Sequence, residues 1–170
     1  MRDRTKLIAT CALLTGMSLV IMFLTSLIPV MQYALVAIAG LLPTVIVIQY
    51  RLKDGFFVYA ATAILGAILL PDKEAALLYL LLFGHYPMVK SLIERLKPYW
   101  LQWVVKLALF NGLTFSALFL AEKLFTQGLE LPDAPIYVFY LVANAAFVVY
   151  DLGFTKLITY FYPRLRKGFK

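Results

Sequence analysis

The sequence predicts an all-α membrane protein: a bundle of six transmembrane helices with the N-terminus and C-terminus both in the cytoplasm. Residues 7–50 form a run of 44 positions without a charged side chain, which is long enough for two crossings of about 20 residues each. Hydrophobic residues make up 63% of the chain and charged residues only 15%, against about 25% in soluble domains. Basic residues gather at the breaks between apolar segments. We expect one transmembrane domain over residues 1–170.

Six apolar segments follow one another along the chain. In lipid each should be helical, because an open strand would leave its backbone groups without hydrogen bonds. Pro29 ends the first segment, and Pro98 opens the fifth, where its missing N–H costs nothing. The polar stretch Thr126–Pro135 separates the last two. The predicted helices are Leu7–Ile28, Val30–Tyr50, Gly55–Leu70, Ala75–Leu96, Tyr99–Phe125 and Ile136–Phe161.

The placement of charge predicts the orientation, since Lys and Arg accumulate on the cytoplasmic ends of membrane helices. With six crossings, four basic regions fall on the same side. They hold twelve of the 16 basic residues: Arg2, Arg4, Lys6, Arg51, Lys53, Lys90, Arg95, Lys97, Arg164, Arg166, Lys167 and Lys170. The other side holds Lys73, Lys123 and the acidic residues Asp72, Glu74, Glu122, Glu130 and Asp133. The net charge of +7 therefore indicates membrane orientation, and we expect no nucleic-acid partner.

Several kinds of chemistry are not indicated by the residues. Cys11 is the one cysteine and His85 the one histidine, so neither a disulfide nor a metal site is expected. The chain has no Gly-rich nucleotide-binding loop and no catalytic constellation, and we expect neither enzymatic activity nor a cofactor. The first segment is expected to be retained, because no small-residue cleavage site precedes a polar chain.

Ionisable residues at membrane depth are functional candidates by default. Counting about 1.5 Å per residue from the predicted cytoplasmic ends places Lys106 and Asp151 at similar depth on sequential helices. We therefore predict an ion pair between them. The pair is either structural or part of a substrate site, and Lys106 has the further option of extending its long stem to the cytoplasmic surface.

His85 stands between Gly84 and Pro87, so a kink or a local opening of the fourth helix is expected there. Discontinuous helices near the midplane often form substrate sites in transporters. The alternative is a histidine that is hydrogen-bonded to a freed backbone carbonyl. A second kink is expected at Pro43, in the middle of the second helix.

Polar and aromatic residues share one face of each of the last two helices, as helical spacing predicts. Such faces should point into the bundle, where they either line a small cavity toward the exterior or form interhelical hydrogen bonds worth about 0.6 kcal/mol each. The candidate substrate-binding residues are His85, Trp103, Lys106, Phe110, Asn111, Tyr137, Tyr140, Asn144 and Asp151.

Ala9, Ala12 and Gly16 place small residues on one face of the first helix, which allows another helix to approach closely. That helix belongs either to the same bundle or to a separate membrane partner. With its length, six helices and basic N-terminus, the chain resembles the S components of energy-coupling factor transporters. The segment Ala12-Leu13-Leu14-Thr15-Gly16 is similar to the motif through which S components contact their coupling protein, although Gly16 departs from the common Ala-xxx-Ala form.

The resemblance implies a function and a set of partners. An S component captures a micronutrient on the exterior side, while a transmembrane coupling protein and cytoplasmic ATPases drive its uptake. Ala9, Ala12 and Gly16 would then bind the coupling protein. We expect a multi-pass protein of a bacterial plasma membrane, surrounded by membrane lipid, with a small-molecule substrate. The alternatives are a non-catalytic scaffold of a cell-envelope or sporulation assembly and, third, an intramembrane lipid-handling enzyme.

Overall fold

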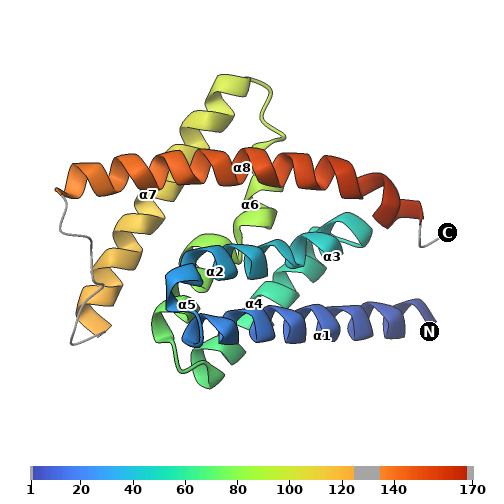
Figure 1. Ribbon diagram of the computed structural model, residues 1–170. Helices are drawn as coiled ribbons and strands as arrows, with labels where there is room; N and C mark the ends of the chain where they lie inside the picture. Colours follow the sequence, from blue (N-terminus) through green and yellow to red (C-terminus); the bar gives the residue numbers. More distant parts are fainter. Residues whose placement is uncertain (1, 125–134, 168–170) are drawn as a thin grey trace. The chain divides into compact units, whose positions relative to one another are not determined.

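The computed structural model describes residues 2–124 and 135–167, with side chains over residues 4–120 and 135–160. All regular elements within these ranges are helical (Figure 1). Six runs are long and apolar enough to cross a membrane: Arg4–Ser26, Pro29–Gln49, Leu52–Leu69, Lys73–Ile93, Tyr99–Leu120 and Ile136–Tyr160. They confirm the predicted all-helical chain with six candidate spans. The cytoplasmic placement of both termini stays a prediction.

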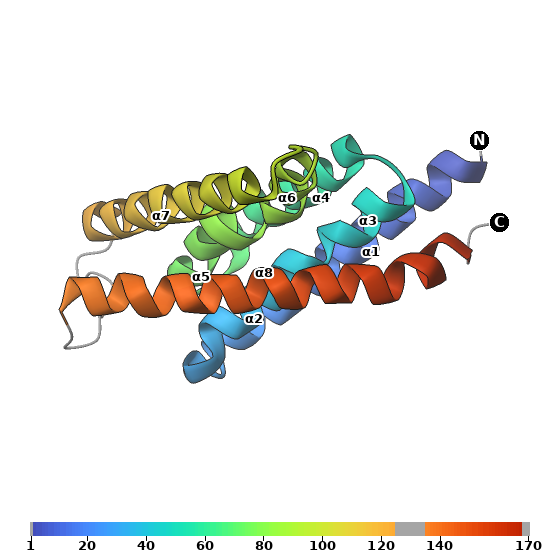
Figure 2. The same cartoon turned by 90° about the horizontal axis from the view of Figure 1, so that it is seen from above.

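The chain passes through successive α-helices (Figures 1 and 2). Short turns of other helical geometry divide some of the long runs. η1 and η2 are 3-10 turns, and η3 is a π-helical turn. In chain order the elements are α1 (Arg2–Phe23), η1 (Leu24–Ser26), η2 (Pro29–Met31), α2 (Gln32–Leu41), α3 (Pro43–Gln49), α4 (Leu52–Leu69), α5 (Lys73–Leu78), η3 (Tyr79–Phe83), α6 (Tyr86–Ile93), α7 (Tyr99–Leu124) and α8 (Ile136–Lys167).

The helices gather into two compact units, Met1–Leu92 and Ile93–Lys170. The first contains α1 to α6 apart from the last residue of α6, and the second contains α7 and α8. The expectation of one transmembrane domain over residues 1–170 stays a prediction.

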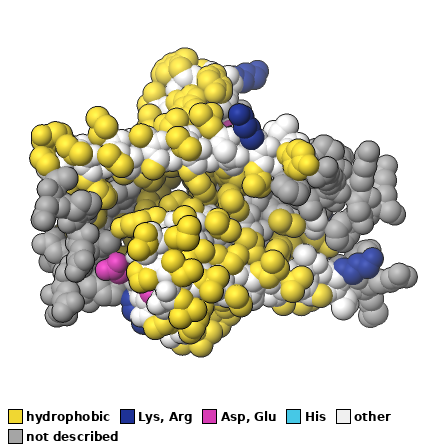
Figure 3. All heavy atoms as spheres, in the orientation of Figure 1, with side chains coloured by type: hydrophobic (Ala, Val, Ile, Leu, Met, Phe, Trp, Pro, Cys, Tyr) yellow, Lys and Arg dark blue, Asp and Glu magenta, His cyan; other side chains and the backbone are white. Residues whose placement is uncertain are grey.

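Large apolar side chains are exposed on the described surface, as expected for helices that face lipid. Leu13, Val20, Leu141 and Val149 are each between 63% and 71% exposed. Hydrophobic side chains cover most of the described part of the face in Figure 3. Soluble monomers rarely expose apolar patches larger than a few hundred Å². The surface therefore agrees with a multi-pass membrane protein.

The first unit packs α1 against α2 and α4, and α3 against α4. Its buried core draws apolar residues from several helices, among them Met22, Ala63 and Tyr79. Gly40 permits a close approach of α2 to η3, because a Cβ at this position would lie 2.7 Å from the carbonyl oxygen of Phe83. No larger residue fits between α2 and η3 without moving the backbone of one of them.

Pro43 interrupts the second span, as the sequence predicts. α2 ends at Leu41 and α3 begins at Pro43. Proline lacks the N–H that would bond to the carbonyl four residues earlier, so the ladder of hydrogen bonds is broken here. Leu42 between the two helices keeps helical dihedrals, with φ −62° and ψ −41°, and the chain therefore continues without reversing.

Asp72 joins three segments at one end of the first unit. Its Oδ1 accepts a hydrogen bond from the backbone N–H of Ala75 at 3.0 Å and thereby caps α5. Its Oδ2 accepts a hydrogen bond from the hydroxyl of Thr25 at 2.9 Å, and the Gln32 amide lies 3.4 Å from Oδ1. One carboxylate thus connects the end of the first span, the start of the second and the start of α5.

The fourth span opens just before His85, which confirms the predicted irregularity. The N–H of Gly84 bonds to the carbonyl of Tyr79 at 2.8 Å, one residue further back than in an α-helix. This shift frees the carbonyl of Leu80, which accepts a hydrogen bond from the Tyr59 hydroxyl at 2.9 Å. The Tyr59 side chain of α4 thus supplies the hydrogen bond that the Leu80 carbonyl lacks within the π-helical turn.

The second unit is a pair of long helices. α7 begins at Tyr99, directly after Pro98, as predicted. Of the predicted polar connection Thr126–Pro135, the structure describes Pro135 alone. The side chains of Glu122 and Lys123 and those of residues 164–170 also lie outside the described residues.

Candidate functional site

A cluster of charged side chains lies between α7 and α8. Lys106 is 4% exposed and Asp151 is 1% exposed, and Lys106 Nζ lies 2.9 Å from Asp151 Oδ2. The predicted ion pair is confirmed. A third charge was not predicted: Glu94 Oε1 lies 3.1 Å from the same Nζ, with a side chain that is 39% exposed. These three residues are called the ion cluster below.

The local structure explains how Glu94 reaches Lys106. The chain turns between α6 and α7, and the Gln102 side-chain amide donates a hydrogen bond to the carbonyl of Leu96 at 2.7 Å. This bond fastens the turn to the first part of α7. Trp103 lies one turn before Lys106 on the same face, and Lys106 Nζ is 5.4 Å from the centre of its ring. The Lys106 ammonium therefore has a cation–π contact with the Trp103 ring in addition to its contacts with the two carboxylates.

Two further contacts continue from the ion cluster along the helix pair. The rings of Phe110 and Phe147 stack with their centroids 4.3 Å apart and an interplanar angle of 14°. Asn111 and Asn144 exchange hydrogen bonds of 2.8 and 2.9 Å between their side-chain amides. Residue numbers rise along α7 as they fall along α8, so the helices are antiparallel. We call the three contacts the α7–α8 contact row.

Both N–H groups of each asparagine side-chain amide donate a hydrogen bond. Asn111 Nδ2 also donates to the carbonyl of Leu107 at 2.8 Å, and Asn144 Nδ2 donates to the carbonyl of Tyr140 at 2.7 Å. Each Nδ2 therefore donates both of its hydrogens, one across the helix pair and one within its own helix. Of the two alternatives drawn from the sequence, interhelical hydrogen bonding is observed for these residues.

The candidate substrate-binding residues separate into groups. The α7–α8 contact row contains Lys106, Phe110, Asn111, Asn144 and Asp151, with Trp103 beside it. Tyr140 takes part through its backbone carbonyl, while its ring contacts Phe139. Tyr137, near the start of α8, is 70% exposed. The predicted exterior cavity around Tyr137, Tyr140 and Asn144 stays a prediction.

His85 belongs to the first unit and lies among aromatic rings. Its ring meets that of Tyr59 edge to face, with centroids 5.9 Å apart, and Tyr59 also stacks on Tyr79 at 6.1 Å. The hydroxyl of Tyr59 holds the freed carbonyl of Leu80. His85 thus lies beside the freed carbonyl of Leu80, as one of the two alternatives from the sequence expected. The sequence did not indicate Tyr59, whose hydroxyl donates a hydrogen bond to that carbonyl.

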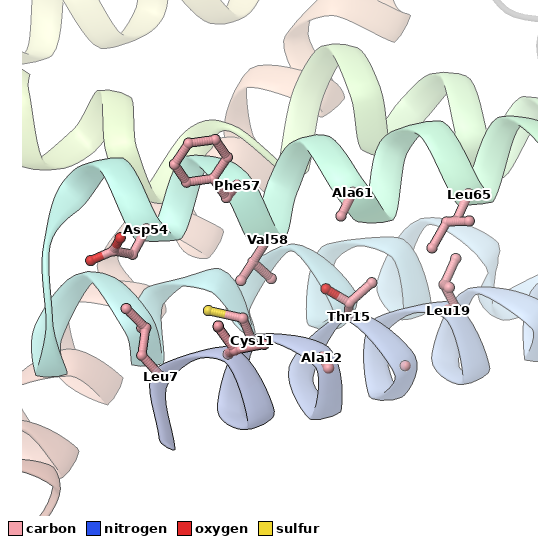
Figure 4. Close-up of a pocket in the computed structure, with 12 residues that line it drawn as sticks. Leu7, Cys11, Ala12, Thr15, Leu19, Asp54, Phe57, Val58, Ala61 and Leu65 are labelled. Atoms are coloured by element: carbon pink, nitrogen blue, oxygen red, sulfur yellow. The ribbon is translucent and has the colours of Figure 1, made fainter. Parts of the chain in front are cut away.

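The small-residue face of α1 is open within its unit. Ala9, Ala12 and Gly16 are all exposed, and a Cβ added to Gly16 would have no neighbouring atom within 4 Å. Ala12 and Gly16 line a groove of about 600 Å³ between α1 and α4, the α1–α4 groove (Figure 4). In Figure 4 the two helices run side by side, with Asp54 near one end and Leu65 near the other.

Sequence reasoning missed three contributors to these sites: Glu94, Tyr59 and Asp54. Glu94 lies in the charged last turn of the predicted helix Ala75–Leu96, whereas Lys106 and Asp151 were paired by their similar depth in the membrane. The sequence feature that could have revealed Glu94 is its acidic side chain near the same predicted end of the bundle as Lys106. Tyr59 and Asp54 acquire their roles from the packing of α4 against other helices, for which the sequence carries no local signal.

Comparisons of the chain with protein-family models, with curated proteins and with solved structures find no match. The described residues contain no group of three or more His, Cys, Asp or Glu side chains placed to hold a metal ion. The fold and surface define a multi-pass helical membrane protein.

Proposed function

We propose that this chain is the substrate-binding membrane subunit of a vitamin-like micronutrient uptake transporter, similar to the S components of energy-coupling factor transporters. It captures its ligand from the exterior and depends on a transmembrane coupling protein and cytoplasmic ATPases for transport. Membrane helices associate through small residues that let backbones approach closely. The observation that carries the proposal is the open face of Ala9, Ala12 and Gly16 on α1.

The ligand-binding part of the proposal rests on the side chains that the helix packing leaves available. The α7–α8 contact row uses Phe110, Asn111 and Asn144 for contacts within the chain. Tyr137 and Tyr140 lie near the start of α8, at the predicted exterior end. Within the described residues their hydroxyls have no hydrogen bond. These two tyrosines are the ligand contacts that we favour for an aromatic or anionic micronutrient.

The proposal is tested by purifying the tagged chain from its native cell in mild detergent and identifying co-purifying proteins and small molecules by mass spectrometry. The wild type should retain an ATPase pair, a coupling protein and a ligand. Gly16→Leu should lose the proteins and keep the ligand, because its side chain enters open space and does not disturb the fold. Gly112→Leu on α7 is the matched control, since a Cβ there also meets nothing within 4 Å.

The structural scaffold is the second candidate, and the α7–α8 contact row favours it. A scaffold packs its polar and aromatic residues against one another, as Phe110 and Asn144 do. Recovery of envelope or division proteins, with neither ATPases nor a ligand, would replace the transporter proposal by the scaffold. Normal recovery of the ATPase complex from Gly16→Leu would remove α1 as the docking helix.

A further inference from the structure

The α1–α4 groove has the dimensions of one lipid leaflet. Along α1 it extends from Leu7 to Leu19, which are separated by about 18 Å of helix. Half the hydrocarbon core of a bilayer is about 15 Å thick. The two helices run parallel, so Leu7 and Asp54 mark one end of the groove and Leu19 and Leu65 the other (Figure 4).

Small residues give the groove its depth. Ala12 and Gly16 on α1 and Ala61 on α4 line the groove, and the remaining lining residues are mostly apolar. A side chain at Gly16 would meet no atom within 4 Å, so the space beside it is open to an occupant from outside the chain. An apolar channel of about 600 Å³ and leaflet length accommodates an acyl chain.

Basic residues surround the end of the groove at which both helices begin. Arg4 lies one turn before the groove-lining Ile8, and Lys53 lies one turn before the groove-lining Phe57. Lys6 and Arg51 are close to them in the sequence. All four basic side chains are exposed, and none forms an ion pair within the described residues.

Asp54 is the described acidic residue at this end, and it lines the groove. Among the side chains that the structure describes at this end, four cations lie near one carboxylate and leave a positive rim, which attracts the phosphate of a negatively charged lipid. A headgroup that also carries hydroxyl donors satisfies the carboxylate of Asp54. A zwitterionic headgroup gains less from this rim because its own cation is repelled by the surplus of basic residues.

We propose that the α1–α4 groove binds an anionic phospholipid of the phosphatidylglycerol class. Its phosphate contacts Arg4 and Lys53, a headgroup hydroxyl donates to Asp54, and an acyl chain lies along Ala12 and Gly16. This site does not depend on the proposed transport function. Because it shares Ala12 and Gly16 with the proposed docking face, a partner helix that docks there displaces the lipid.

The headgroup assignment is tested by native mass spectrometry of the full chain in mixed micelles, titrated with phosphatidylglycerol, phosphatidylethanolamine or phosphatidylcholine. The double variant Arg4→Gln/Lys53→Gln should bind phosphatidylglycerol about 30-fold more weakly, at about fivefold for each charge. Its affinity for phosphatidylcholine should not change. The matched control Arg95→Gln/Lys97→Gln removes one Arg and one Lys elsewhere and should bind as the wild type does.

The acyl-chain assignment is tested with a photo-crosslinking amino acid at position 12 in native membranes, with position 108 as control. Both residues are exposed alanines on spanning helices. Position 12 should yield lipid adducts enriched in phosphatidylglycerol, and position 108 adducts of bulk composition. Equal binding of the three lipids, an unchanged affinity of the Arg4→Gln/Lys53→Gln variant, or protein adducts alone at position 12 would overturn the lipid site.

Discussion

The ion cluster allows a prediction in which a double substitution does less damage than one of its single substitutions. Lys106→Met leaves the carboxylate of Asp151 buried without its ammonium partner, 2.9 Å away in the wild type. Removing one partner of a buried ion pair costs about 3–5 kcal/mol of unfolding free energy. We expect about 4 kcal/mol for Lys106→Met, because Asp151 is almost fully buried.

The converse substitution should be milder. Asp151→Leu leaves Lys106 with Glu94 at 3.1 Å, so the ammonium keeps a carboxylate and we expect a loss of about 2 kcal/mol. The double variant Lys106→Met/Asp151→Leu places two apolar side chains against each other. Replacing a buried ion pair by apolar residues is often nearly neutral, and the double variant should lose at most about 2 kcal/mol.

The three variants are compared by unfolding in mixed micelles of increasing SDS fraction, followed by the helical circular dichroism signal. Lys156→Met is the control: it removes an exposed lysine on α8 and should change stability by less than about 0.5 kcal/mol. A double variant that loses the sum of the single losses, about 6 kcal/mol, would refute energetic coupling between Lys106 and Asp151.

Three smaller effects should be measurable in the same assay. Asn111→Leu leaves the amide of Asn144 without its partner across the helix pair and should cost about 0.6–1.7 kcal/mol. Tyr59→Phe removes the hydrogen bond to the freed Leu80 carbonyl and should cost about 1 kcal/mol, with faster amide exchange in the π-helical turn. Gly84→Ala should destabilise the first unit, because the new Cβ would lie 2.6–2.8 Å from atoms of two tyrosine rings.

Each of these effects has a matched comparison. Gly112→Ala adds the same methyl group where nothing lies within 4 Å, and it should be neutral or slightly stabilising. Asn111→Leu/Asn144→Leu should be less harmful than the two single losses added together. Equal losses for Gly84→Ala and Gly112→Ala would contradict the close packing at Gly84. Unchanged amide exchange in Tyr59→Phe would contradict a stabilising role of the tyrosine.

The six spans were predictable because lipid imposes simple rules on a sequence. A charged side chain is costly in the hydrocarbon core, so the apolar segments and their charged ends mark the helices closely. The irregularities at Pro43 and His85 followed from residues that break the hydrogen-bond ladder locally. Counting depth along two helices was sufficient to pair Lys106 with Asp151, because both had to lie at the same height.

Contacts that depend on helix rotation were less accessible. Asn111 and Asn144 were both recognised as interior residues, but their reciprocal bonding requires the relative rotation of α7 and α8. Glu94 was overlooked because the predicted helix continued to Leu96, whereas α6 ends at Ile93 and Glu94 reaches Lys106 from the turn that follows. The exposure of Ala12 and Gly16 also depends on the rotation of α1 about its axis. The same spacing of small residues is equally suited to packing inside the bundle.

The attachment of Asp72 has a consequence for motion. This one carboxylate connects the end of the first span with the start of α5, at the end of the unit opposite to Leu7. At that opposite end Leu7 and Asp54 line the open α1–α4 groove. Displacements of α1 relative to α4 should therefore pivot about Asp72, so that the groove widens most at the end where both helices begin.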